Sequence, residues 1–99
     1  MSGDDDWGFA PPPFNADNAL QQLKRSLRDL KLAERGKGFE LKGKAVVELA
    51  PNDGVIAVKL ARRLSMTPEW DQVQIRSGAD QRKLLDDVKR RLERWQRED

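Results

Sequence analysis

The chain contains no cysteine, no histidine and no tyrosine. Without cysteine it can form neither a disulfide framework nor a reactive thiolate. Without histidine it lacks the usual general base near neutral pH and the commonest transition-metal ligand, and tyrosine nucleophiles are excluded as well. Catalysis would have to rely on carboxylates, lysine, serine or threonine. We therefore expect a protein that is not an enzyme and that holds no metal and no cofactor.

Long hydrophobic runs are lacking too. The longest apolar runs are far shorter than a membrane span, and the acidic N-terminus has no basic region followed by an apolar one. We expect a cytoplasmic protein with no membrane partner. Its 99 residues are 37% hydrophobic and 36% charged, which fits one soluble globular domain with a heavily charged surface.

Residues 1–14 differ in composition from everything that follows. They hold three of the six aromatic residues, three of the five prolines and a run of three aspartates. We expect residues 1–14 to form a flexible tail, and residues 15–99 to form a single domain. In the tail, Trp7 and Phe9 are candidate partner-binding residues beside the proline run. Phe14 precedes the first helix and is expected to pack against the domain.

Apolar residues at helical spacing predict a helix near each end of the domain. The first helix begins at a cap formed by Asn15 or Asp17 and ends near Glu34, and Ser77 caps the last helix. The predicted apolar stripes are Ala16, Leu20, Leu23, Leu27 and Leu30 in the first helix and Leu84, Leu85, Val88, Leu92 and Trp95 in the last.

Between the helices the apolar residues alternate, which predicts three strands. The first runs from Phe39 to Leu49, the second from Val55 to about Ser65, and a short third covers residues 72–76. Placing Leu49 opposite Ile56 across the turn brings apolar residues together along the hairpin. We expect an α+β fold, a two-layer αβββα sandwich whose three-stranded antiparallel meander has both helices on one face.

Two resemblances to nucleic-acid-binding domains bear on this interpretation. Residues 60–68 resemble the first helix and turn of a bacterial helix-turn-helix, but Asp71 stands where the second helix needs an apolar residue. The element order resembles that of the double-stranded RNA-binding domain, in order only. Asp80 lies among the bases at the start of the last helix, where that family has a segment rich in lysine and alanine.

The open face of the sheet is the first candidate interaction surface. We expect it to carry Lys44, Val46, Ala57, Lys59 and Ala61, which are smaller and more apolar than a solvated face prefers. Such a face would bind an unknown protein partner or a second copy of the chain. The protein would then be a monomer or a homodimer.

Basic residues on the helices form the second candidate site. They are Lys24, Arg25, Arg28, Arg82, Lys83 and Arg90. Clustered positive charge binds nucleic-acid phosphates with an affinity that falls steeply with salt. Asp86 and Asp87 lie among these bases, which favours helix surfaces covered by ion pairs. We expect a small non-catalytic protein-interaction module, with a domain that binds duplex RNA or DNA as the alternative.

Overall fold

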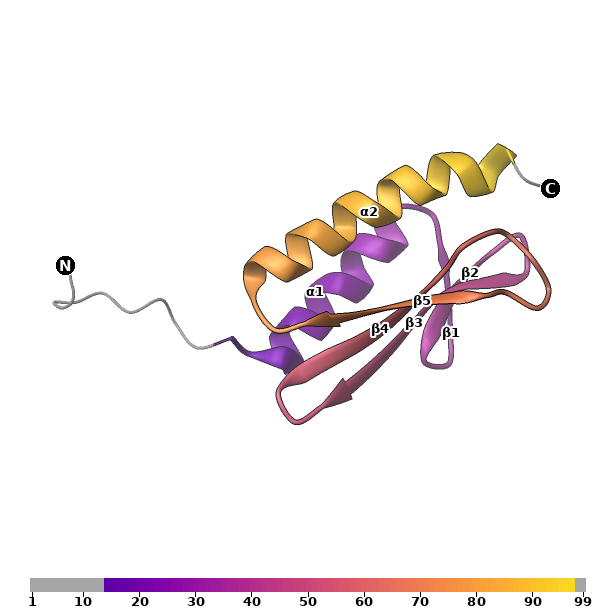
Figure 1. Ribbon diagram of the computed structural model, residues 1–99. Helices are drawn as coiled ribbons and strands as arrows, with labels where there is room; N and C mark the ends of the chain where they lie inside the picture. Colours follow the sequence, from indigo (N-terminus) through magenta and orange to yellow (C-terminus); the bar gives the residue numbers. More distant parts are fainter. Residues whose placement is uncertain (1–13, 98–99) are drawn as a thin grey trace, which may run out of the picture.

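Two helices lie over one face of an antiparallel sheet in the computed structural model (Figure 1). The structure describes residues 14–97, and no helix in that range is long and apolar enough to cross a membrane. The helices are α1 (Ala16–Asp29) and α2 (Gly78–Arg97), and the strands are β1 (Ala33–Arg35), β2 (Gly38–Leu41), β3 (Lys44–Asn52), β4 (Val55–Ala61) and β5 (Trp70–Ile75).

The α+β class and the two helices agree with the prediction, but the sheet has five strands rather than three. Their order is β1-β2-β3-β4-β5, so every strand pairs with its neighbours in the chain. The predicted first strand is divided by a two-residue turn at Lys42 and Gly43, whose φ angles are 56° and 79°. Positive φ at both positions is the signature of a type I′ hairpin turn.

Helix α1 ends at Asp29, five residues before the predicted end, and this frees the chain to form β1. The amide of Lys31 donates to the Arg28 carbonyl, and the amide of Leu32 donates to the Leu27 carbonyl. This pattern is a Schellman motif, with Lys31 at a φ of 72° in the position that glycine usually takes. Leu32 is then turned into the core, where it is 3% exposed.

The β3–β4 hairpin itself is predicted correctly and most of its side chains lie on the expected faces, but its register is wrong. Val47 lies opposite Leu60 and Leu49 opposite Val58, two residues away from the predicted alignment. The reason is the turn, which uses only Asp53 and Gly54. A shift of two residues keeps every side chain on its own face, so alternation alone does not distinguish the two registers.

A β-bulge interrupts the pairing of β2 with β3. Phe39 pairs with Val47 and Glu40 pairs with Ala45, which leaves Val46 as the extra residue. Val46 and Val47 are consecutive, and both are fully buried. The prediction that Val46 lies on the open sheet face is therefore wrong, because a bulge breaks the alternation on which it rested.

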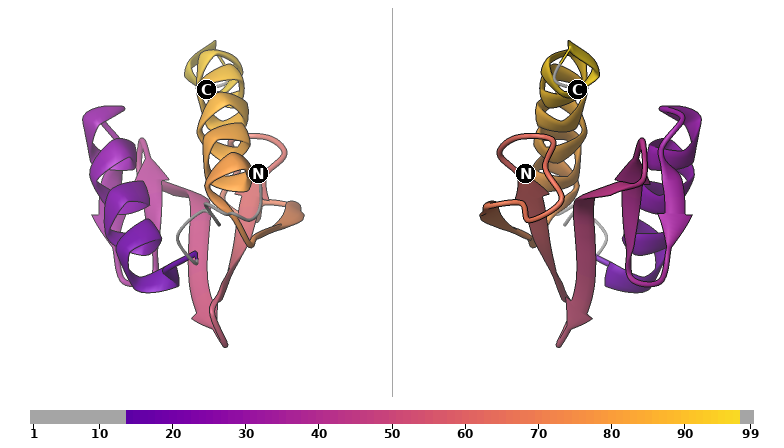
Figure 2. Two further views of the ribbon diagram at one scale, coloured as in Figure 1. Left: turned by 90° about the vertical axis from the view of Figure 1, so that its left-hand side faces the viewer. Right: turned by 90° about the vertical axis from the view of Figure 1, so that its right-hand side faces the viewer.

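The core lies between the helices and the sheet. Helix α1 packs on β1, β3 and β4, whereas α2 packs on β5, and Figure 2 shows the two helices above different parts of the sheet. The buried helical residues are Ala19, Leu23 and Leu27 in α1 and Leu84, Val88 and Trp95 in α2. Phe14 packs against this core as predicted. Asn15 caps α1 by accepting a hydrogen bond of 3.0 Å from the Asn18 amide.

Candidate interaction surface

The predicted open-face site is only partly on the surface. Ala57 and Lys59 are exposed and Lys44 is partly exposed, but Ala61 is fully buried, as Val46 is. Ala61 is the last residue of β4 and lies opposite Trp70, which packs against the core. The prediction for Ala61 is therefore wrong, since the end of β4 is covered.

Small and polar side chains make up the rest of this face. Its exposed residues include Glu48, Ala50, Ala57, Lys59, Gln72 and Gln74. Glu48 lies opposite Lys59, so opposite charges are neighbours across the strands. Among residues 14–97, Met66 is the only large hydrophobic side chain that is exposed. Within residues 14–97, the open face of the sheet therefore presents no large apolar patch to a partner.

The two edge strands of the sheet, β1 and β5, differ in length and in charge. Strand β1 has three residues, all exposed, and two of them are the charged Glu34 and Arg35. Short charged strands of this kind resist pairing with another chain. Strand β5, at the other edge, has six residues, of which only Asp71 is charged, and it contains neither lysine nor proline. It therefore lacks the lysine and proline that commonly prevent an edge strand from binding a further strand.

The pairing of β5 with β4 determines which backbone amides and carbonyls of β5 point away from β4. The Arg62 amide donates to the Glu69 carbonyl, which makes this a hydrogen-bonded pair of the antiparallel ladder. Such pairs alternate, so residues 71, 73 and 75 bond to β4 while Trp70, Gln72 and Gln74 direct their backbone groups away from it. Because β5 is the last strand in the sheet order, no other strand within residues 14–97 pairs with the outward amides and carbonyls of Gln72 and Gln74.

A groove runs between this edge and α2. Its volume is about 360 Å³, and it is lined by Val73, Gln74, Asp80, Lys83, Leu84, Asp86, Asp87 and Arg90. Val73 and Leu84 supply its apolar surface, and the charged residues all come from α2. A strand added to β5 would place alternate side chains into this groove.

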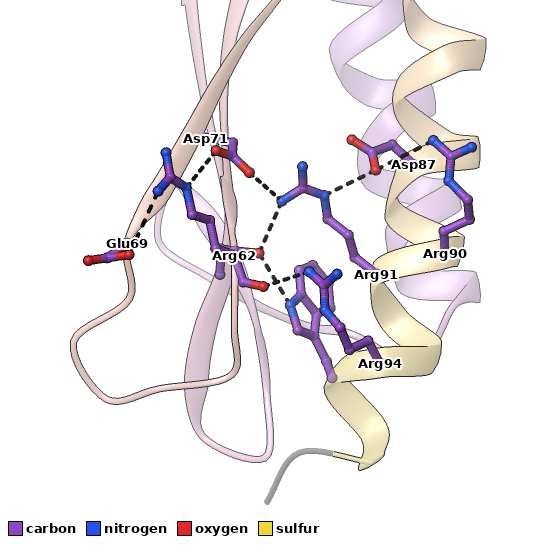
Figure 3. A network of polar contacts seen from close by, with 9 residues as sticks. Arg62, Glu69, Asp71, Asp87, Arg90, Arg91 and Arg94 are labelled. Atoms are coloured by element: carbon purple, nitrogen blue, oxygen red, sulfur yellow. Dashed lines mark hydrogen bonds and ion pairs between the residues drawn. The ribbon is translucent and has the colours of Figure 1, made fainter.

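An arginine–aspartate network lies between β5 and α2, and two of its residues, Asp87 and Arg90, also line the groove (Figure 3). Asp71 of β5 accepts hydrogen bonds from Arg62 at 2.7 Å and from Arg91 at 2.9 Å, so its two oxygens face arginines from two elements. Arg91 also donates to Asp87 at 3.1 Å and to the Ala61 carbonyl at 3.3 Å. The network thereby ties the beginning of β5 to the middle of α2.

Positive side chains outnumber negative ones around the network. A hollow of about 470 Å³ is lined by Arg62, Asp71, Asp87, Arg90, Arg91 and Arg94. The hydrogen bond from Arg62, and then that from Arg91, holds the pKa of Asp71 below its ordinary value. Burial disfavours the charge of Arg91, but hydrogen bonds to Asp87 and Asp71 outweigh it and raise the pKa of that guanidinium. Four arginines against two aspartates leave the lining of this hollow positive.

Removing the Asp71 charge should change how stability depends on pH. Because the pKa of Asp71 is lowered in the folded state, its contribution is fully present above the ordinary aspartate pKa of 3.8 and is lost as the pH falls through the lowered value. We expect Asp71→Asn to melt below the wild type at neutral pH, with the difference vanishing in strong acid. Melting curves recorded over a pH series test this, with the exposed Asp86→Asn as control. A constant difference between wild type and Asp71→Asn at every pH would contradict the assignment.

The predicted nucleic-acid residues do not form one surface of free positive charge. Glu34 accepts a hydrogen bond of 2.8 Å from Arg28 and lies 3.6 Å from the Lys24 ammonium. Arg90 lies 3.7 Å from Asp87, whereas Arg25, Arg82 and Lys83 are exposed. Lys83 and Arg90 line the groove beside β5, and the bases of α1 do not. Nucleic-acid binding by these six residues stays a prediction.

Three further interpretations of the sequence concern other parts of the chain. Trp7 and Phe9, the candidate binding residues of the tail, lie outside the described residues. Within residues 14–97, no group of three acidic side chains comes together in a way that could hold a metal ion. The helix-turn-helix interpretation is wrong, because residues 55–61 and 70–75 are strands.

Comparisons with protein-family models, with curated proteins and with solved structures found no match. The edge of β5 was not among the predicted sites. Its signal was nevertheless present in the sequence as a stretch, Trp70–Ile75, with a single charge and no lysine, glycine or proline. Recognising it as an edge requires the strand order, which only the structure gives.

Proposed function

We propose that this chain is a non-catalytic protein-interaction module that binds its partner by strand addition at β5. The observation that carries the proposal is the edge of β5 beside a groove, formed by β5 and α2, that can receive side chains of the added strand. Backbone hydrogen bonds would supply affinity, and the groove would supply specificity.

Three features support strand addition over binding at the open sheet face. The open face is polar and loses Val46 and Ala61 to the core. The opposite edge, β1, is short and charged. The groove beside β5 has both apolar and charged walls, as a site for alternating side chains needs.

Replacing Gln72 with proline should abolish binding at this edge without unfolding the protein. Proline removes the amide that points away from β4, and edge strands tolerate proline where that amide faces solvent. The probes are short linear peptides selected from a display library on the full chain. We expect them to slow amide exchange at Gln72 and Gln74, and to bind Gln72→Pro at least about tenfold more weakly.

Gln72→Thr is the matched control, because it changes the side chain and keeps the backbone amide. It should bind the same peptides as the wild type does. Circular dichroism establishes that both variants are folded. If the selected peptides bind Gln72→Pro as tightly as the wild type, β5 is not the binding edge and the proposal fails.

A further inference from the structure

We infer that the partner at β5 is a second copy of this chain, bound about a two-fold axis near Val73. This inference rests on the proposed function, because it uses the same edge and the same groove. It follows from two patterns, one in the backbone of β5 and one in the charges of α2, which share one symmetry.

The backbone pattern of β5 suits antiparallel pairing with itself. With the axis at Val73, Gln72 lies opposite Gln74 of the second copy, and Gln74 lies opposite its Gln72. These are the residues whose backbone groups point away from β4, so each pair can exchange two hydrogen bonds. Val73 then meets its own counterpart on the helix side of the sheet, where it already lines the groove and is partly buried.

The charges on the groove side of α2 are complementary to themselves. Asp80, Lys83, Asp87 and Arg90 alternate in sign at spacings of three, four and three, so they lie along one flank of the helix. A second copy related by a two-fold axis presents the same series in reverse order. Each acid then meets a base, with Asp80 opposite Arg90 and Lys83 opposite Asp87.

The carboxylates in this series keep capacity for a second partner. Among the described residues, Asp87 accepts through Oδ1 from Arg91 and lies 3.7 Å from Arg90 through the same oxygen, and Asp80 accepts through Oδ2 from the Arg76 amide. One oxygen of each carboxylate therefore remains for a base of the second copy. Lys83 and Arg90 are exposed, and their side chains can reach across the groove. The same flank thus supplies both halves of every expected ion pair.

Sedimentation equilibrium of the full chain over a concentration series tests the inference. We expect a dimer with a dissociation constant in the micromolar range, since pairing at one strand edge buries less than a standard interface of about 1,600 Å². Lys83→Glu/Arg90→Glu places acids opposite Asp87 and Asp80 and should raise that constant at least about tenfold. Lys89→Glu/Arg97→Glu makes the same charge change on exposed residues of α2 outside the groove, and should leave it unchanged.

Amide exchange gives the second readout. Protection at Gln72 and Gln74 should rise with protein concentration in the wild type and be lost in Lys83→Glu/Arg90→Glu. A chain that stays monomeric overturns the inference, while peptides that still protect these amides would leave the proposed function standing. A dimer that survives Lys83→Glu/Arg90→Glu overturns the two-fold arrangement. Protection that requires residues 1–13 and is independent of concentration overturns it as well, because the occupant would then be the N-terminal segment.

Discussion

Replacing Trp95 with alanine is expected to lower the free energy of unfolding by about 3–5 kcal/mol. The indole ring is fully buried and is the largest side chain of the core. Its Nε1 donates a hydrogen bond of 3.2 Å to the Ala61 carbonyl and so joins the last turn of α2 to the end of β4. The variant therefore loses apolar burial, creates a cavity and removes a donor in one change. Urea denaturation followed by circular dichroism measures the loss.

Trp95→Phe separates these contributions if the alanine variant does not fold. It keeps an aromatic ring in the core, removes the donor and leaves a smaller cavity than alanine does, and the Ala61 carbonyl still accepts from Arg91. We expect a loss of about 1–2 kcal/mol. Met66→Ala is the control, because Met66 is 76% exposed and should cost less than about 0.5 kcal/mol. Equal stabilities for Trp95→Ala and Met66→Ala would refute the packing described for α2.

Gly38→Ala is expected to be the second large loss, about 3 kcal/mol. A methyl group at Gly38 would overlap the Val47 carbonyl oxygen and lie 3.2 Å from the Glu48 Cα. Both atoms belong to the backbone of β3, so the clash is relieved only by separating β2 from β3 beside the bulge. The Leu49 amide donates to the Lys37 carbonyl at 2.9 Å next to this point, which limits the movement further.

Gly78→Ala is the matched control for this substitution. An added Cβ at Gly78 meets no atom within 4 Å, and the residue begins α2, where alanine has the higher helix propensity. We expect unchanged or slightly raised stability. Thermal melts of both variants decide the point. If Gly38→Ala is as stable as Gly78→Ala, the close approach of β2 and β3 is not as described.

Much of the fold follows from local patterns in the sequence. The stripes of both helices are found in the core as predicted, and Asn15 and Phe14 take their expected places. These predictions rest on helical periodicity and capping, which act within a few residues. The hairpin of β3 and β4 also follows, because the apolar alternation on both sides of the turn is strong.

The errors occur where a single residue changes the pattern. Lys31 ends α1 in a conformation that usually requires glycine, so the sequence contains no signal for it. Lys42 and Gly43 form a tight turn inside what reads as one alternating strand. Val46 bulges out of the ladder, so it is buried beside Val47 although alternation placed it on the open face. Neither the end of α1 at Lys31 nor the bulge at Val46 follows from the local preference of the residue concerned.

The candidate site at the β5 edge could not be predicted from the sequence for a related reason. Alternation shows which side chains face the helices, but it does not show which strand lies at an edge. The basic residues of α2 were predicted as a phosphate-binding face, whereas Arg90 and Lys83 line a groove with Asp80 and Asp87. Their relation to β5 appears only when the strand order is known.

The meander has a consequence for how the chain reaches this structure. Because each strand pairs only with its sequence neighbours, and the turns at residues 42–43 and 53–54 have two residues each, most of the sheet forms by closing very short loops. Short closures cost little chain entropy and favour fast folding. The costly step is left to the helices, which come from opposite sides of the strand region and meet through Gln22 and Gln81, 59 residues apart. The strands should therefore find their register before the two helices complete the core.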